Sequence, residues 1–135
     1  MGGLAGLRLL LDTHIWLWSL EDPDRLGRRV LHELRNPENE RWLSPISAWE
    51  ILILHAKKRI RLPGNVSSWI ARATAPFQEA PVTHEIAISS RTLPLFHGDP
   101  ADRFLAATAH VLQLTLVTAD ARLLGLGEIS TLANR

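Results

Sequence analysis

Two strand-like runs of this chain lead into an aspartate, and this pattern limits the possible folds more than any other feature. Residues 8–11 are mostly apolar with no amphipathic alternation, as expected of a strand buried on both faces, and Asp12 follows them directly. Residues 115–118 form a second such run, rich in β-branched side chains, which leads through Ala119 to Asp120. In open α/β sheets, ligands bind outside the carboxyl ends of the strands. We therefore expect Asp12 and Asp120 to lie together at such an edge.

Three further carboxylates occur in segments with helical features. Glu50 lies within a helix predicted over residues 45–58. Asp99 and Asp102 open a helix predicted over residues 99–113. Like charges gathered at one end of a sheet are costly unless a divalent cation neutralises them. The pattern therefore predicts a metal site built from Asp12, Glu50, Asp102 and Asp120.

Each carboxylate also has a purely local explanation. Asp12 and Asp120 could each cap the helix that follows, and a glutamate on a helix, such as Glu50, is commonly solvated. For Asp99 the cap is the better account, because a proline follows it at the first helical position. Asp102, in the first turn, could serve the helix dipole and a metal together. The metal prediction rests on the set rather than on any single member.

The order of predicted elements favours one compact fold. Strands alternate with helices, which implies parallel crossovers and an α/β fold, a three-layer α/β/α domain with a short, mainly parallel central sheet. Residues 1–135 are expected to form this single domain, with residues 1–7 as a flexible leader. The predicted strands are 8–11, 41–43, 77–82, 115–118 and 129–132, and the predicted helices are 13–20, 25–35, 45–58, 66–74, 84–91, 99–113 and 120–124.

Composition excludes several classes of protein. The chain has 135 residues, 46% of them hydrophobic, so it can bury a sizeable core. The absence of cysteine excludes disulfides, thiolate zinc sites and a cysteine nucleophile, and it is compatible with a cytoplasmic location. No apolar run reaches the roughly 18 residues that a membrane span needs, and no signal peptide is recognised.

Basic and aromatic residues give weaker signals. The net charge of +1 provides no global attraction to nucleic acid. A local basic group could follow an RNA backbone, or it could be a solvated helix end; its members are Lys57, Lys58, Arg59 and Arg61. The histidines, at 14, 97 and 110 among others, lack metal-ligand spacing. The five tryptophans, at 16, 18, 42, 49 and 69, fit core or interface anchors better than a base-stacking platform.

The ordered set of motifs resembles that of PIN-domain ribonucleases, specifically the VapC-type toxins of type II toxin–antitoxin systems. The resemblance is carried by four motifs, at residues 9–14, 47–51, 97–103 and 116–120, in an order and spacing that hold from residue 8 to 132. Each motif is short, and the ordered set is specific. The chain departs from the family pattern at Leu54, where many relatives have lysine, and at Lys58, where glycine is frequent. It also departs at residues 98–101.

The resemblance implies a metal-dependent endoribonuclease that cleaves single-stranded regions of RNA. Asp12 and Asp102 take the primary Mg²⁺ or Mn²⁺ site, Glu50 orients or deprotonates the water, and Asp120 completes the site or holds a second ion. Auxiliary positions fall to Thr13, Ser47, Asp99 and Thr118. The resemblance further implies a homodimer and a cognate antitoxin protein whose C-terminal segment covers the acidic pocket.

Three alternatives were weighed against this interpretation. A haloacid-dehalogenase-type phosphatase needs a second aspartate two residues after the first, where this chain has His14. A receiver-like signalling domain needs an acidic pair after the first strand and a lysine after the last, and neither is present. A catalytically inactive PIN-like scaffold that binds RNA or protein remains open, because sequence does not measure activity.

Overall fold

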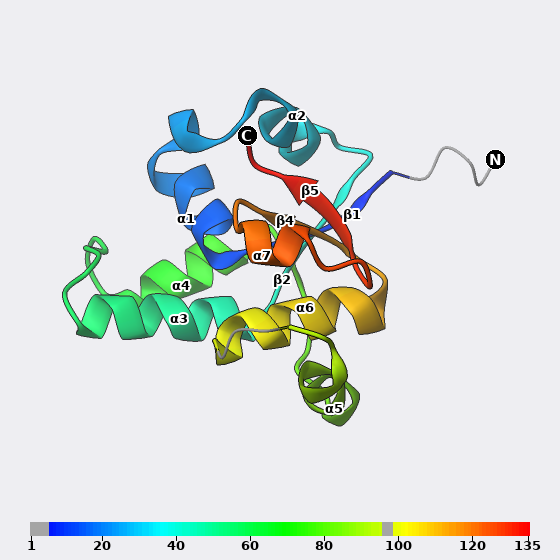
Figure 1. Ribbon diagram of the computed structural model, residues 1–135. Helices are drawn as coiled ribbons and strands as arrows, with labels where there is room; N and C mark the ends of the chain where they lie inside the picture. Colours follow the sequence, from blue (N-terminus) through cyan, green and yellow to red (C-terminus); the bar gives the residue numbers. More distant parts are fainter. Residues whose placement is uncertain (1–5, 96–98) are drawn as a thin grey trace.

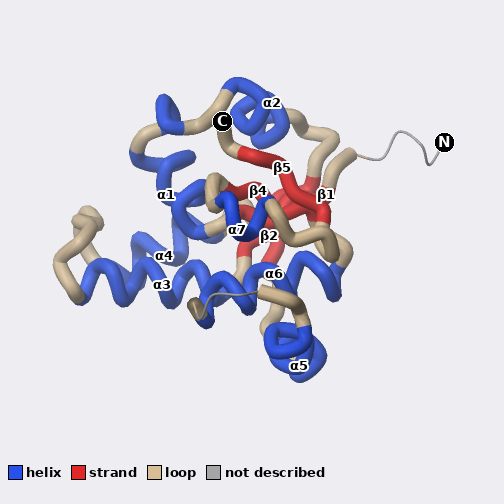
Figure 2. Tube along the Cα trace, viewed as in Figure 1, coloured by secondary structure: helices blue, strands red, loops and turns tan. Residues whose placement is uncertain are grey.

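The computed structural model describes residues 6–95 and 99–135, and its centre is a five-stranded sheet (Figures 1 and 2). The strand order is β3-β2-β1-β4-β5, and every described pairing is parallel, so the predicted mainly parallel sheet is fully parallel here. Residues 1–5 of the predicted leader and the predicted turn at His97–Gly98 lie outside the described residues. The strands are β1 (Arg8–Leu11), β2 (Glu40–Leu43), β3 (Gln78–Glu79), β4 (Thr115–Thr118) and β5 (Ser130–Ala133).

Helices cover both faces of the sheet, which confirms the three-layer α/β/α fold. Alternate residues of β1 face opposite layers: Leu9 and Leu11 pack with α1 to α4, whereas Leu10 packs with α5, α6 and α7. Figure 1 shows α2 and α6 on opposite sides of the sheet, with α5 against α6. The helices are α1 (Thr13–Glu21), the 3-10 helix η2 (Pro23–Arg25), α2 (Arg28–Arg35), α3 (Pro45–Ala56), α4 (Val66–Thr74), α5 (His84–Thr92), α6 (Pro100–Leu112) and α7 (Ala121–Leu124).

Helix α6 approaches the sheet closely because its inner face is made of small residues. Ala106 and Ala107 are fully buried and Ala109 is 2% exposed. The side chain of Arg103 connects the start of this helix to α5 and to the segment that follows α5. Its guanidinium donates to the carbonyls of Ser90, at 3.2 Å, and Leu95, at 2.6 Å.

Two predicted elements differ from the structure for clear reasons. The strand predicted over residues 77–82 is reduced to β3, because Pro81 has no backbone N–H with which to extend a ladder. The helix predicted from residue 25 begins at Arg28 instead. Gly27 is extended at φ −65° and ψ 160°, and the backbone of Arg135 runs so close to Gly27 that a Cβ there would lie 2.0 Å from its carbonyl oxygen.

None of the helices within the described residues is long and apolar enough to cross a membrane.

Helix α3 ends in a left-handed turn at a lysine. Lys58 has φ 59°, and its N–H donates to the carbonyl of His55 at 3.0 Å, while the N–H of Arg59 donates to that of Leu54 at 2.9 Å. This is the Schellman arrangement, in which glycine is the favoured residue because a Cβ destabilises the left-handed conformation. A lysine at this position therefore carries a conformational cost that glycine would avoid.

Replacing Lys58 by glycine should therefore stabilise the fold. We expect Lys58→Gly to raise the free energy of unfolding by about 1 kcal/mol, because it removes left-handed strain. Lys57→Gly is the matched control, since Lys57 has φ −84° and carries no such strain. Thermal or urea unfolding of both variants is the measurement. A Lys58→Gly variant no more stable than Lys57→Gly would contradict this account of the turn.

Candidate active site

Five carboxylates from four parts of the chain line one open pocket of about 460 Å³. Asp12 follows β1 and Asp120 follows β4, the two adjacent central strands at which the chain switches from one side of the sheet to the other. Glu50 comes from α3, and Asp99 and Asp102 come from the start of α6. The structure thus brings together all five acids that the sequence singled out.

Asp12 caps a helix, as one of its two predicted roles requires, and its carboxylate also lines the acidic pocket. One carboxylate oxygen caps α1 by accepting from the N–H of Thr13 at 2.8 Å. The other oxygen accepts from the hydroxyl of Thr118 at 2.6 Å, across the junction between β1 and β4. Thr118 is fully buried, and its hydroxyl oxygen also accepts from the N–H of Asp120 at 3.0 Å. Capping therefore fixes the orientation of Asp12 and leaves it on the pocket wall.

Two buried hydroxyl groups hold Glu50. Thr13, 1% exposed, donates to the Glu50 carboxylate and lies 2.9 Å from the hydroxyl of Ser47, with which it is hydrogen-bonded. Ser47 stands one turn before Glu50 on α3 and is fully buried. Thr13 and Ser47, predicted as auxiliary residues, thus connect α1 to α3 and orient the carboxylate between them.

The start of α6 supplies the remaining pair of acids. Asp99 is the N-cap and accepts from the N–H of Ala101 at 3.0 Å, so the predicted cap is confirmed. Asp102 lies in the first turn and is only 8% exposed, which is a deep position for a carboxylate.

Asp120 has two local partners in addition to its place on the pocket wall. It caps the short helix α7 by accepting from the N–H of Arg122 at 2.8 Å. It also forms an ion pair with the guanidinium of Arg122, with 3.1 Å between Nη2 and Oδ2. Arg122 lines the same pocket, so the site contains a cation from this chain beside its acids.

The electrostatics of the pocket disfavour a full set of charges. Burial, followed by repulsion from Asp99 and Asp12, raises the pKa of Asp102 to about 7. Burial also raises the pKa of Asp12, against the lowering effect of its hydrogen bonds from Thr118 and Thr13. The pKa of Glu50 is raised chiefly by burial as well. Positive charge added to this pocket would reduce the repulsion among its carboxylates.

The acids of the pocket are the right type of ligand for a hard divalent cation, but their side chains are not positioned to share one. Carboxylate oxygens are the ligands that Mg²⁺ and Mn²⁺ prefer. Within residues 6–95 and 99–135, no three acidic or histidine side chains stand close enough to share one ion. The bond from Thr13 to Glu50 and the ion pair of Asp120 hold two of the carboxylates in other contacts. A shared ion would therefore need these side chains in other rotamers.

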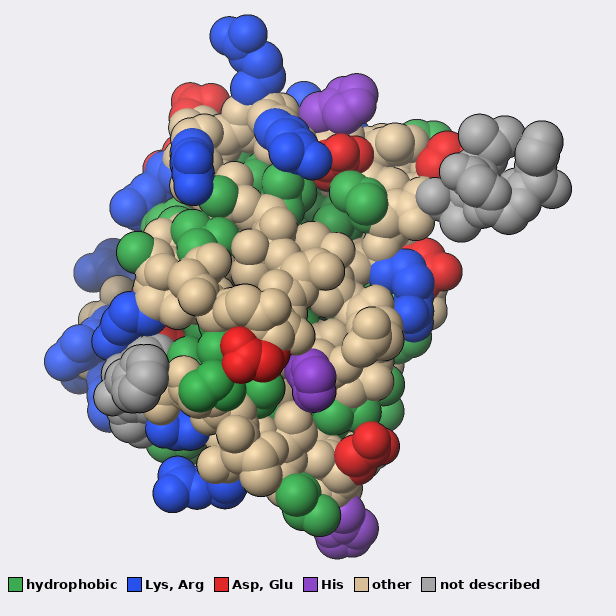
Figure 3. All heavy atoms as spheres, turned by 45° about the vertical axis from the view of Figure 1, so that its right-hand side comes forward, with side chains coloured by type: hydrophobic (Ala, Val, Ile, Leu, Met, Phe, Trp, Pro, Cys, Tyr) green, Lys and Arg blue, Asp and Glu red, His purple; other side chains and the backbone are tan. Residues whose placement is uncertain are grey.

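The predicted RNA-backbone residues lie outside this pocket. Lys57, Lys58 and Arg59 are exposed at the end of α3, and Arg61 is exposed in the segment that follows. Figure 3 shows Lys and Arg side chains gathered along the left edge of the face in view, whereas acidic side chains there stand singly. The surface charge is therefore uneven despite a net charge of +1.

Three polar or aromatic residues that line the pocket were not assigned to the site from the sequence: His14, Trp18 and Arg122. His14 and Trp18 are one helical turn apart in α1, so they lie on the same side of that helix. Because Asp12 is the N-cap of α1, this spacing could have predicted that both residues lie near the carboxylate. Arg122 is two residues after Asp120, where a side chain at the start of a helix can reach back to its own cap.

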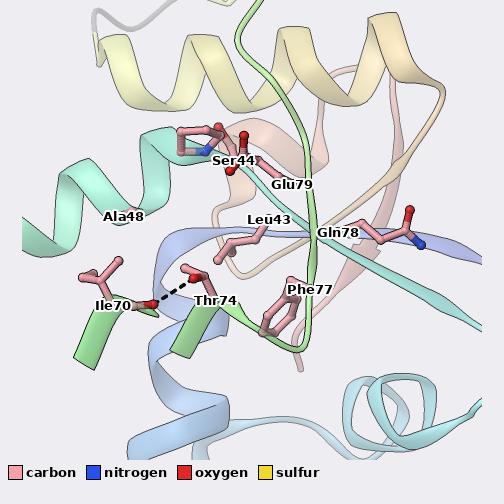
Figure 4. A pocket seen from close by; sticks show the side chains of 9 residues that line it. Leu43, Ser44, Ala48, Ile70, Thr74, Phe77, Gln78 and Glu79 are labelled. Carbon is pink, nitrogen blue, oxygen red and sulfur yellow. Dashed lines mark hydrogen bonds between the residues drawn. The ribbon is translucent and has the colours of Figure 1, made fainter. Parts of the chain in front are cut away.

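A second hollow, of about 230 Å³, lies beside the edge strand β3, next to α3 and α4 (Figure 4). Its wall includes Leu43, Thr74 and Phe77, and its one carboxylate is that of Glu79. A single acid among mainly apolar groups offers neither a cation site nor a nucleophile, so the acidic pocket is the stronger candidate for an active site.

Comparison with known proteins agrees with this geometry. The PIN domain family matches residues 9–128. Ribonuclease VapC22 of Mycobacterium tuberculosis is 34% identical over 116 residues, which cover 85% of this chain and 88% of that protein.

Solved structures share the fold at lower identity. VapBC2 from Rickettsia felis, bound to a promoter DNA fragment, superposes with a TM-score of 0.72 and 16% identity, covering 96% of this chain and 100% of that chain. A toxin–antitoxin complex from Klebsiella pneumoniae gives a TM-score of 0.63 and 23% identity over 93% and 96% of the two chains. The family match over residues 9–128 and the 34% identity to a VapC ribonuclease agree with the sheet and the acidic pocket. This chain belongs to the PIN-domain family, among the VapC-type proteins.

Proposed function

We propose that this protein is a Mg²⁺- or Mn²⁺-dependent endoribonuclease that cleaves single-stranded RNA and acts as the toxin of a toxin–antitoxin pair. The observation that carries the proposal is the convergence of five carboxylates at the β1–β4 junction of a PIN-domain chain. The name of its relative, a ribonuclease, supports the choice of RNA as substrate. We assign the activity to a single domain in the cytoplasm.

The residues divide the work according to their surroundings. Asp12 and Asp102 are the proposed primary metal ligands, because Asp102 is buried, Asp12 is half-buried, and both carboxylates line the same pocket. Glu50, oriented by Thr13, directs or deprotonates the attacking water. Asp120 completes the site or holds a second ion, and Asp99 assists as an auxiliary acid. A bound cation supplies charge neutralisation at the phosphate and lowers the pKa of water.

The basic group at the end of α3 is the proposed contact for the RNA backbone. Lys57, Lys58, Arg59 and Arg61 are all exposed and can neutralise phosphates that run past the pocket.

A partner protein is proposed to cover the pocket. The structural neighbours include toxin–antitoxin complexes, and the acids here suit an arginine from an antitoxin segment. The ion pair of Arg122 with Asp120 supports this idea, because it places a guanidinium against the same acids.

A homodimer is proposed through α3. Trp49 and Leu52, three residues apart on this helix, are 50% and 42% exposed, so one face presents two large apolar side chains.

The first experiment measures cleavage of mixed RNAs with Mg²⁺, Mn²⁺ or EDTA. We expect Asp12→Asn and Asp102→Asn each to lower activity at least roughly 100-fold without unfolding the protein, because charge is lost while shape is kept. Glu50→Gln should be nearly as damaging. Asp99→Asn should cost less, because asparagine still caps a helix.

Asp24→Asn is the matched control, since Asp24 is exposed on η2 and outside the pocket. Near-wild-type turnover in either Asp12→Asn or Asp102→Asn would show that the ligand assignment is wrong. A wild-type protein that binds RNA without cutting it under any metal condition would favour the inactive scaffold instead.

The pKa of Asp102 predicts how metal-free stability depends on pH. Its pKa is about 7 in the fold, above an unfolded value of about 3.9. A carboxylate whose folded pKa is raised favours the fold while protonated, so its contribution is complete below pH 4 and falls as pH rises to about 7. In EDTA, Asp102→Asn should therefore gain stability relative to wild type across this range.

Thermal unfolding between pH 4 and 8, with and without Mn²⁺, is the measurement. Added Mn²⁺ should stabilise wild type by RT ln(1 + [L]/Kd), increasingly so as pH rises, and Asp102→Asn much less. Asp24→Asn should follow wild type throughout. Equal Mn²⁺ shifts in wild type and Asp102→Asn would remove Asp102 from the metal site.

Light scattering tests the homodimer. Wild type should be dimeric at micromolar concentration, and Trp49→Lys should shift the mass to that of a monomer, because a charge cannot be buried without a partner. Ile88→Lys is the control: Ile88 is 67% exposed, but it lies on α5 rather than on α3. A wild-type protein that stays monomeric at high micromolar concentration would contradict the proposal.

A further inference from the structure

The acidic pocket has an aromatic wall. Trp18 and His14, on one side of α1, both line the pocket together with the five carboxylates. Their rings lie 5.9 Å apart between centroids and are tilted by 51°. Trp18 is half-buried, with part of its surface against the core.

Trp18 differs in its surroundings from the tryptophans that serve the core. Trp16 is fully buried, donates from its indole nitrogen to the carbonyl of Ala73 at 3.1 Å, and packs against Trp69 at 5.8 Å between ring centroids. Those two confirm the predicted core anchors. Trp18 instead lines the pocket that holds the five carboxylates.

A cation supports the Trp18 ring. The guanidinium carbon of Arg25 lies 4.3 Å from the centroid of the ring, a cation–π contact that fixes the indole plane. Arg25 is itself held by Asn134, whose side chain donates to the Arg25 carbonyl at 3.0 Å and accepts from the N–H of Gly27 at 2.7 Å.

The same asparagine connects this support to the acids. The backbone N–H of Asn134 donates to the carbonyl of Thr118 at 2.9 Å, and the hydroxyl of Thr118 holds Asp12. The aromatic wall and the principal carboxylate are therefore fixed relative to one another through one short chain of hydrogen bonds.

An aromatic ring can bind RNA in a pocket whose acids repel phosphate. The carboxylates that a cation leaves charged repel a phosphodiester, so a neutral contact would add to the attraction that the cation and the basic group provide for RNA. Stacking of a base on an aromatic ring is such a contact, and it requires a base that is not already stacked in a duplex.

We propose that Trp18, flanked by His14, is a nucleobase-stacking subsite beside the cleavage centre and selects single-stranded RNA. The inference rests on the proposed ribonuclease function and assigns it a specificity-determining residue. One base next to the scissile phosphate stacks on the indole, and Arg25 holds the indole in place. Stacking of this kind contributes roughly 5- to 150-fold in affinity per base.

The test compares kinetics on short RNAs in which a single abasic ribose is moved along the sequence. Trp18→Leu should raise KM roughly 5- to 150-fold with kcat little changed, and Trp18→Phe should retain most of the wild-type KM. For wild type, an RNA that lacks the base at one position should show a KM raised by a similar factor. For Trp18→Leu, the same abasic RNA should show almost no further rise in KM.

Trp42→Leu is the matched control. Trp42 is also half-buried and also carries an arginine over its ring, Arg8 at 5.4 Å, but it does not line the pocket. It should leave the abasic profile unchanged. Thermal melts exclude unfolding as a cause. If Trp18→Leu does not fold, Arg25→Gln removes only the support and should raise KM by a smaller factor.

Abasic penalties that are the same in wild type and Trp18→Leu overturn the subsite. The subsite is also overturned if Trp18→Leu keeps the wild-type KM for RNA but binds an antitoxin more weakly. Trp18 would then be a contact for protein rather than for RNA. If wild type cleaves no RNA, the proposed function fails instead. The subsite is then judged by fluorescence anisotropy with the same RNAs, where equal affinities of wild type and Trp18→Leu count against it.

Discussion

The hydrogen bond from Thr118 to Asp12 is the contact on which the rest of the site depends. It joins the ends of β1 and β4, adjacent strands whose pairing sets residues 106 positions apart side by side in the sheet. Asp12 caps α1 with its other oxygen, so the same carboxylate sets the direction of that helix and of its pocket-facing residues. One buried contact thus connects the sheet, the first helix and the site.

Around this contact the protein tolerates an electrostatic cost. Asp102 is 8% exposed among like charges, and its pKa is raised to about 7. Native structures retain such unfavourable groups where function needs them and offset them elsewhere. Here the offset is local: hydroxyl groups of Thr13 and Thr118, backbone N–H groups at helix starts and the guanidinium of Arg122 each neutralise part of the charge.

Sequence reasoning succeeded where local signals and burial agree. The strand at residues 8–11 and the helix at 66–74 match the structure at both ends, because apolar runs and caps define them within a few residues. It missed Trp18 and Arg122 as pocket residues, because their place depends on how α1 and α7 are set against the sheet. Nor could local sequence reveal the second partner of Asp12, because Thr118 lies 106 residues away and is brought to it only by the pairing of β1 with β4.

The strand order also has a consequence for the chain during synthesis. Because β4 lies beside β1, Asp120 and the hydroxyl that holds Asp12 are supplied only after more than three quarters of the polypeptide has been made. A nascent chain that has reached α5 contains Asp12 and Glu50 but neither α6 nor β4, and contacts so distant in sequence form late. A chain that has reached only α5 therefore has two of the five carboxylates of the pocket, and its Asp12 lacks the hydroxyl group that orients it.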